Sequence, residues 1–179
     1  ILHHSPTDRK RFSGFVHRTF NGEDAIYLLK ALQEVYRNHG GLEGLLHKHI
    51  TTPSEFGHSI SGFRNELLSF KAPARFSKHL ADPLRNSSAK RLCMYFRWMV
   101  RKDKAGVDFG IWKNITPAVL HCPLDLHSGR VARHLGLLTR QQDDWNVVTE
   151  LTTALRKFDK NDPAKYDFAL YGAGIGQVL

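Results

Sequence analysis

The residues best suited to chemistry lie in residues 122–137, where Asp125 is the only carboxylate and stands two residues after a proline. A short basic helix is expected to follow, with Arg130 and Arg133 three residues apart and therefore on one face. Val131 and Leu135 are four apart and indicate its buried side. A carboxylate beside a basic helix suits a site that holds an anionic backbone while a cationic centre forms. Asp125 also fits a simple helix cap, and both roles stay open here.

Lys90 is the candidate nucleophile. A helix is expected to begin near Ser87 or Ser88, which places Lys90 in its first turn. The positive end of the helix macrodipole lies at that turn and favours a neutral amine. Only the neutral form of a lysine is nucleophilic. The alternative is an ordinary exposed lysine on a solvated helix face.

The spacing of residues along this expected helix predicts which side chains share a face with Lys90. Spacings of four, three and four residues put Lys90, Met94, Arg97 and Arg101 on one face. Four apolar residues are expected to pack inward: Leu92, Phe96, Met99 and Val100. Trp112 fits either the core or a ligand contact, and we expect the core.

The rest of the chain shows helical periodicity and no sustained alternation typical of strands. Asn21 and Asp24 predict a helix start, and Gly40-Gly41 predicts its end. Later helices are expected from Pro53, around Phe76 to Leu84, over 141–158, and from Asp162-Pro163 to the glycines at 172–176. Their inward stripes are Phe56, Ile60, Phe63 and Leu67, and then Trp145, Val148, Leu151, Thr152, Leu155 and Phe158.

These elements predict an all-α fold of about seven to nine short helices. We expect residues 1–179 to form a single domain, with two helical halves of about 1–80 and 81–179 that flank a cleft.

The charge of the chain favours a polyanionic partner. The 179 residues contain 26 Lys+Arg against 17 Asp+Glu, which gives a formal net charge of +9. The sequence pI is about 9.8. Nucleic acid is the first candidate, and a basic protein without such a partner is the alternative.

Several other classes of protein are disfavoured. Cys93 and Cys122 lie far apart, which argues against a zinc ribbon, an iron–sulfur cluster or a disulfide scaffold and favours a cytoplasmic setting. No run of 18 apolar residues exists, so no membrane association is expected. His47 and His49 lack ligand partners at suitable spacing, so neither a metal nor another cofactor is expected.

Three segments resemble the helix-hairpin-helix base-excision DNA glycosylases. Pro123-Leu124-Asp125-Leu126-His127 is similar to their Pro-Val-Asp-Thr-His segment, whose Asp is catalytic. Lys90 resembles the nucleophile of the bifunctional members. The run from Lys165 to Gly172 resembles the final helix behind their site. This likeness covers roughly residues 80–175.

A closer resemblance covers nearly the whole chain. The segments 15–22, 97–102, 107–112 and 123–125 look like a bacterial family of unknown function, itself a distant relative of archaeal 8-oxoguanine glycosylases. Members of that family carry further N-terminal helices, so we expect this chain to lack some of the bundle. The usual Leu-Pro-Gly-Val-Gly hairpin is replaced by residues 82–88, which contain no glycine.

The resemblance implies a DNA glycosylase with AP-lyase activity on oxidised purines. Lys90 would attack the sugar, and Asp125 would stabilise the charge that develops there. Double-stranded DNA with a damaged base is the implied partner; RNA stays open, and a monomer is expected. The implied phosphate contacts come from Ser87, Ser88, Arg130 and Arg133. The gap that the flipped base leaves in the duplex would be filled by His17, Arg18 and Asn21.

Two alternatives remain. One is a non-catalytic nucleic-acid-binding module that keeps the same helical scaffold. The other is a helical interaction domain whose basic charge is incidental. The enzyme hypothesis requires that the Lys90 amine and the Asp125 carboxylate face one cleft.

Overall fold

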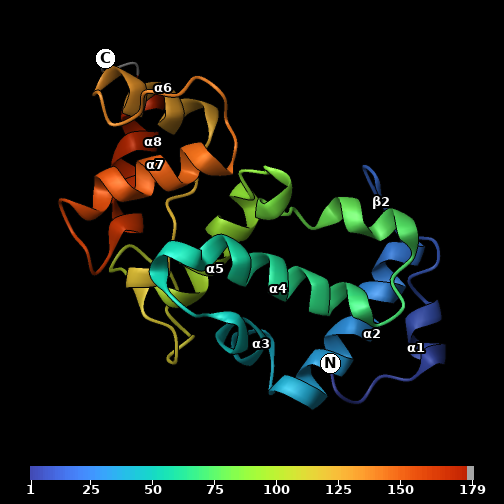
Figure 1. Ribbon diagram of the computed structural model, residues 1–179. Coiled ribbons are helices and arrows are strands. Elements are labelled where there is room, and N and C mark those ends of the chain that lie inside the picture. Colours follow the sequence, from blue (N-terminus) through green and yellow to red (C-terminus); the bar gives the residue numbers. More distant parts are fainter. Residues whose placement is uncertain (177–179) are drawn as a thin grey trace.

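The computed structural model describes residues 1–176 and shows an all-α protein (Figure 1). These residues contain eight α-helices, a two-stranded hairpin and several short 3-10 helices. The α-helices are α1 (Pro6–Lys10), α2 (Gly22–His39), α3 (Leu42–His49), α4 (Phe56–Ser69), α5 (Lys90–Val100), α6 (Leu126–His134), α7 (Trp145–Arg156) and α8 (Asp167–Ile175). The 3-10 helices are η1 (Pro53–Glu55), η2 (Ala74–His79), η3 (Pro83–Arg85), η4 (Pro117–Val119) and η5 (Pro163–Tyr166).

A small hairpin precedes the longest helix. Strands β1 (Val16–His17) and β2 (Phe20–Asn21) pair antiparallel, and Arg18 in the turn has a left-handed φ of 56°. Asn21 then caps α2 in a reciprocal capping box with Asp24, which confirms the predicted start. Gly40, at φ 70°, ends α2 as predicted.

Two buried clusters hold the molecule together. The larger one runs from Tyr27 to Leu120 and includes the predicted stripe of α4, whose four apolar side chains are all buried. The smaller one joins α6, α7 and α8. Ala164 in η5 also belongs to the larger cluster, and Trp145 packs against both. In Figure 1, α6–α8 lie at one end of the molecule, α1 and the β1–β2 hairpin lie at the other, and α4 runs between them.

Helices α6 and α8 pack closely against each other. Gly174 allows this approach, because a Cβ atom at that position would lie 2.9 Å from the Cβ of His127. Asp125 is fixed at the start of α6 and Asp167 at the start of α8. The packing of the two helices therefore positions both carboxylates.

Several helix boundaries differ from the expectation. Helix α5 begins at Lys90 rather than at Ser87 or Ser88, and its N-cap residue Ala89 has a left-handed φ of 46°. Helix α7 begins at Trp145, because the Asp144 carboxylate accepts the Val147 N–H there. The predicted end within the glycines at 172–176 is confirmed, since α8 ends at Ile175 with Gly176 as its C-cap residue.

Three residues that were expected to point inward or to cap a helix do not do so. Phe158 lies past the end of α7 and is 65% exposed. Leu135, expected on the buried side of its helix, is the C-cap residue of α6 and is 53% exposed. Asp162 makes no side-chain cap bond, because its carboxylate accepts hydrogen bonds from Arg101. By contrast, Trp112 is buried in the larger cluster, which confirms its expected core position.

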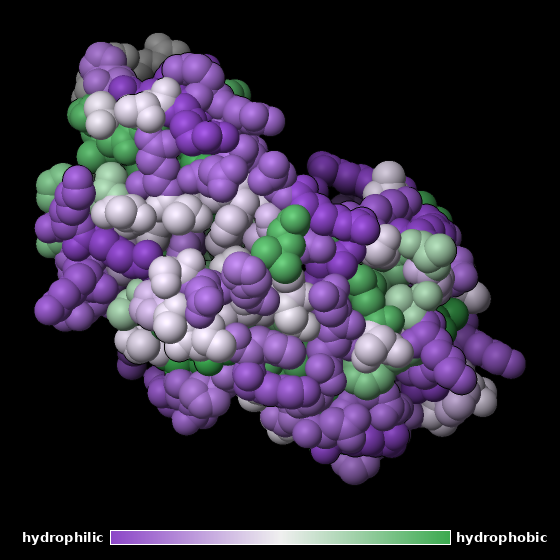
Figure 2. Space-filling model, in the orientation of Figure 1, coloured by the Kyte–Doolittle hydropathy of each residue, from purple (hydrophilic) through white to green (hydrophobic). Residues whose placement is uncertain are grey.

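The surface seen in Figure 2 is mostly hydrophilic, and apolar residues form small separate patches. Within residues 1–176, no helix has the length and apolar character needed to cross a bilayer.

Candidate functional site

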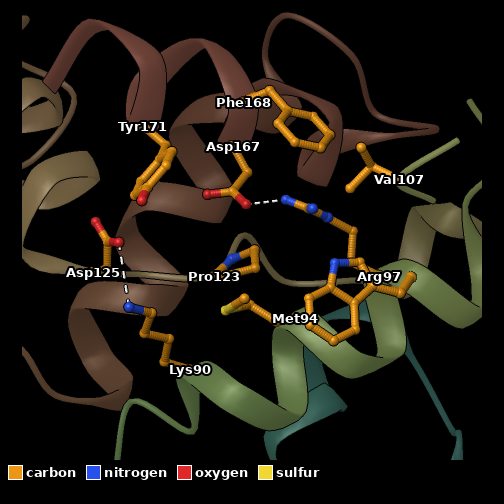
Figure 3. Close-up of a pocket in the computed structure, with 10 residues that line it drawn as sticks. Lys90, Met94, Arg97, Val107, Pro123, Asp125, Asp167, Phe168 and Tyr171 are labelled. Carbon is orange, nitrogen blue, oxygen red and sulfur yellow. Dashed lines mark hydrogen bonds and ion pairs between the residues drawn. The ribbon is translucent and has the colours of Figure 1, made fainter. Parts of the chain in front are cut away.

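A cavity of about 270 Å³ lies between α5 and α8, at the junction of the two buried clusters (Figure 3). Helix α5 contributes Lys90, Met94 and Arg97 of its predicted face, and α8 supplies the opposite wall. The fourth residue of that face, Arg101, does not line the cavity and instead pairs with Asp108 and Asp162. The remaining sides come from the segments around Val107 and Pro123. The lining residues are Lys90, Met94, Arg97, Trp98, Val107, Pro123, Asp125, Asp167, Phe168 and Tyr171.

Lys90 and Asp125 meet at one side of this cavity. The Lys90 Nζ atom donates to Asp125 Oδ2 at 3.2 Å, although the two residues are 35 positions apart in the chain. Lys90 is the first residue of α5, and Asp125 is the N-cap of α6. The required common cleft therefore exists.

The two carboxylate oxygens of Asp125 make different contacts. Its Oδ1 atom accepts the Ser128 N–H at 2.8 Å and caps α6, while Oδ2 holds Lys90. The Ser128 hydroxyl accepts the Asp125 N–H at 2.9 Å and completes the capping box. Burial opposes the charge, but the Ser128 N–H and Lys90 outweigh it and lower the pKa of Asp125. The carboxylate is thus ionised and fixed in place.

A second carboxylate, Asp167, lies on the opposite wall. Its partner is Arg97, whose guanidinium also donates to the buried Asp108 at 3.1 Å. The Arg97 guanidinium carbon lies 4.3 Å from the ring centroid of Phe168. Burial raises the pKa of Asp167 to about 6, even though Arg97 acts in the opposite direction. The pocket therefore contains one carboxylate held ionised and one that titrates near neutrality.

Two further hollows, each larger in volume than this cavity, lead from Lys90 along the surface. The first, of about 380 Å³, is lined by Ser87, Ser88, Lys78, His79 and Arg91 and shares Lys90 with the cavity. The second, of about 360 Å³, shares His79 and Arg91 with the first and reaches the hairpin at His17 and Arg18. We call Lys78, His79, Arg91, His17 and Arg18 the basic track.

The structure places the other expected DNA contacts differently. Arg130 is exposed and has no ion pair or hydrogen bond within residues 1–176. Arg133 donates to the carbonyls of Arg140 and Gln141 and to Asp143, so its guanidinium already supports the loop after α6. The Asn21 side chain caps α2. Of the residues named for phosphate and gap contacts, Ser87 and Ser88 line the first hollow beside Lys90, and His17 and Arg18 line the second.

Sequence reasoning missed the α8 wall of the cavity. Asp167, Phe168 and Tyr171 all point into the space between α5 and α8 (Figure 3). Their i, i+1, i+4 spacing at the start of a helix was the available signal, but a carboxylate in a first helical turn is ordinary. Within residues 1–176, no group of three His, Cys, Asp or Glu side chains is arranged to hold a metal ion.

Comparison with known proteins places the chain in a family. Neither the curated proteins nor the solved structures include a match. Residues 1–176 match the family described as "Protein of unknown function (DUF2400)". Because the match spans nearly the whole chain, the protein belongs to this family of unknown function, DUF2400.

Proposed function

We propose that this protein is a DNA glycosylase with AP-lyase activity, which removes an oxidised purine and then cleaves at the abasic site. The observation that carries the proposal is the 3.2 Å contact between Lys90 Nζ and Asp125 Oδ2 at the edge of a cavity. A lysine nucleophile needs a neighbouring group that orients it, and here a rigid carboxylate does so. The resemblance of residues 80–175 to helix-hairpin-helix glycosylases gives the reaction class.

The residues suit a reaction through a cationic sugar. A flipped nucleotide places its base in the cavity and its C1′ atom beside Lys90. Lys90 gives up its ammonium proton to solvent and attacks C1′ as the bond to the base breaks. Asp125 stays ionised because the Ser128 N–H binds it, and its charge stabilises the oxocarbenium-like sugar. Loss of a proton and opening of the sugar ring then leave a Schiff base on Lys90, which permits strand cleavage.

The approach to Lys90 suits a phosphate backbone. Ser87 and Ser88 lie just before the N-terminus of α5, where backbone N–H groups and the helix dipole favour an anion. Asn86 has a left-handed φ of 61°, a conformation that glycine usually provides in such a turn. The hairpin without glycine therefore still makes a left-handed turn before α5. The basic track extends the same surface toward β1.

Borohydride trapping tests the proposal directly. The chain is incubated with duplex DNA that contains 8-oxoguanine or an abasic site, and sodium borohydride reduces any Schiff base to a stable covalent complex. We expect trapping with the wild type and none with Lys90→Gln. Lys160→Gln is the matched control, because Lys160 is exposed and is not among the residues that line the cavity.

The outcome separates the enzyme from the binding module. If wild-type protein forms no covalent complex on any oxidised or abasic substrate, the lyase proposal is wrong. Salt-sensitive DNA binding without trapping would then favour the non-catalytic nucleic-acid-binding module.

A further inference from the structure

The cavity contains two carboxylates with opposite surroundings. Asp125 accepts hydrogen bonds from the Ser128 N–H and from Lys90, so it is stabilised as an anion. Asp167 is mostly buried on the α8 wall and has the Arg97 guanidinium as its ion-pair partner. Figure 3 shows the other Asp167 oxygen turned toward the interior of the cavity, on the side of Tyr171. Such a pair of environments commonly separates the acid from the base in an active site.

The burial of Asp167 and the charges that face it explain why its pKa is raised. From α5, Arg97 favours the anion, but Arg97 also donates to the fully buried Asp108 and so divides its charge between two carboxylates. Lys90, also on α5, favours the anion more weakly. Asp125 and Asp108 both oppose a further negative charge, and burial opposes it most. The buried thiols of Cys93 and Cys122, which lie near Asp167, are uncharged.

We propose that Asp167 is the proton donor to the leaving base, an assignment that rests on the proposed glycosylase function. Its free oxygen faces the space where a flipped base would lie. The Phe168 and Tyr171 side chains of α8 line the same wall and offer aromatic surfaces to a base. A base that leaves as a neutral molecule leaves more readily than an anion, which is the purpose of a general acid.

The atoms and electrons of this step balance. The bond between C1′ and the base nitrogen breaks, and its electron pair remains on the base. The Asp167 O–H transfers its proton to the base, which departs neutral. Lys90 first releases its ammonium proton to solvent, and its nitrogen lone pair then forms the new bond to C1′, which leaves the positive charge on that nitrogen. Asp167 is left as a carboxylate beside Arg97, and solvent returns its proton before the next turnover.

An abasic substrate isolates this role, because it carries no base to protonate. Single-turnover rates are measured with 8-oxoguanine duplex, as base released, and with the same duplex containing a preformed abasic site, as strand incised. We expect Asp167→Asn to slow base release about 100-fold. The rate of abasic-site incision is expected to fall by a much smaller factor. Asp167→Glu, which keeps an ionisable proton, is expected to restore part of the base release.

The pH profile gives a second readout that a purely structural role would not move. Wild-type base release should fall above about pH 6 as Asp167 loses its proton. Asp167→Asn should lack this decline, and Asp159→Asn, which removes an exposed carboxylate paired with Lys165, should retain it. Thermal unfolding of each variant identifies any general loss of fold.

Two results overturn the assignment, and they differ from failure of the proposed function. Equal losses by Asp167→Asn on both substrates, or an unchanged decline above pH 6, show that Asp167 does not donate the proton. Absence of borohydride trapping by wild-type protein on abasic DNA overturns the lyase itself and the Asp167 assignment with it.

Discussion

At the scale of single residues, the two carboxylate oxygens of Asp125 make different hydrogen bonds. One oxygen caps α6 through Ser128, and the other holds Lys90. A helix cap ties a side chain to a fixed backbone position, so the cap supplies the rigidity that a catalytic carboxylate needs. Capping and chemistry are therefore not competing explanations for this residue, and they can be separated experimentally.

Asp125→Asn separates the charge from the cap. Asparagine caps helices as well as aspartate does, so the free energy of unfolding should change by less than about 1 kcal/mol. Loss of the charge should reduce borohydride trapping on abasic DNA about 100-fold or more. Urea denaturation and trapping of the same preparations check the two expectations.

Ser128→Ala is the complementary variant. It removes the hydroxyl that accepts the Asp125 N–H, and we expect a loss of about 1 kcal/mol in stability. Its trapping should fall far less than that of Asp125→Asn. Comparable trapping in Asp125→Asn and wild type would reduce Asp125 to a structural cap.

Asp167 makes stability depend on pH in a predictable direction. Its pKa rises from 3.8 to about 6 on folding, so the folded state binds this proton more tightly. The resulting stabilisation is fully present below about pH 3.8 and is lost as the pH rises through 6. Between pH 4.5 and 7.5, ionisation of this one group should lower the free energy of unfolding of the wild type by about 2 kcal/mol.

Asp167→Asn removes that dependence. We expect the free energy of unfolding of the variant, relative to wild type, to rise by about 2 kcal/mol between pH 4.5 and 7.5. Urea denaturation at both pH values measures the difference. A constant difference would mean that Asp167 is already ionised at pH 4.5 in the folded protein.

At the scale of elements, the contact between α6 and α8 sets the width of the cavity. Gly174 lies against His127 with no room for a side chain, whereas a Cβ atom at Gly172 in the same helix would meet nothing within 4 Å. The helix that carries Asp167 is thus placed by one glycine relative to the helix that Asp125 caps.

Gly174→Ala should move α8 away from α6. A methyl group 2.9 Å from the backbone oxygen and the Cβ of His127 forces a shift, and we expect a loss of about 1–3 kcal/mol in stability. Gly172→Ala is the matched control and should be neutral or stabilising by up to about 1 kcal/mol, because alanine favours a helix interior. Chemical denaturation distinguishes them, and equal effects would show that the helices are not in tight contact.

The same elements show what the sequence can reveal. The α4 stripe and the α2 cap follow local rules, and both were predicted correctly. Lys90 and Asp125 were paired by resemblance, since no local rule joins positions 35 residues apart. The α5 start at Lys90 was missed, because it depends on the unusual left-handed backbone of Ala89. Asp167 was missed because its significance comes only from burial against α5.

At the scale of the whole molecule, part of the positive charge lies along the basic track on the surface. Lys78 and Arg91 are exposed, and neither forms an ion pair within residues 1–176. Both line hollows that lead from Lys90 toward the β1–β2 hairpin. A net charge of +9 attracts any polyanion, but a backbone that follows this route would contact these two side chains specifically.

The salt dependence of DNA binding tests this route. Each phosphate contact contributes about 0.9 to the slope of log affinity against log salt concentration on duplex DNA. We expect Arg91→Gln to reduce the slope by about 0.9, and Lys78→Gln with Arg91→Gln to reduce it by up to about 1.8. Lys48→Gln removes the same charge from α3, where Lys48 pairs with Glu66 at 3.2 Å, and should leave the slope unchanged. Fluorescence anisotropy at several salt concentrations measures all four proteins. Equal slopes for the double variant and the α3 control would show that DNA takes another path and that the net charge alone explains the attraction.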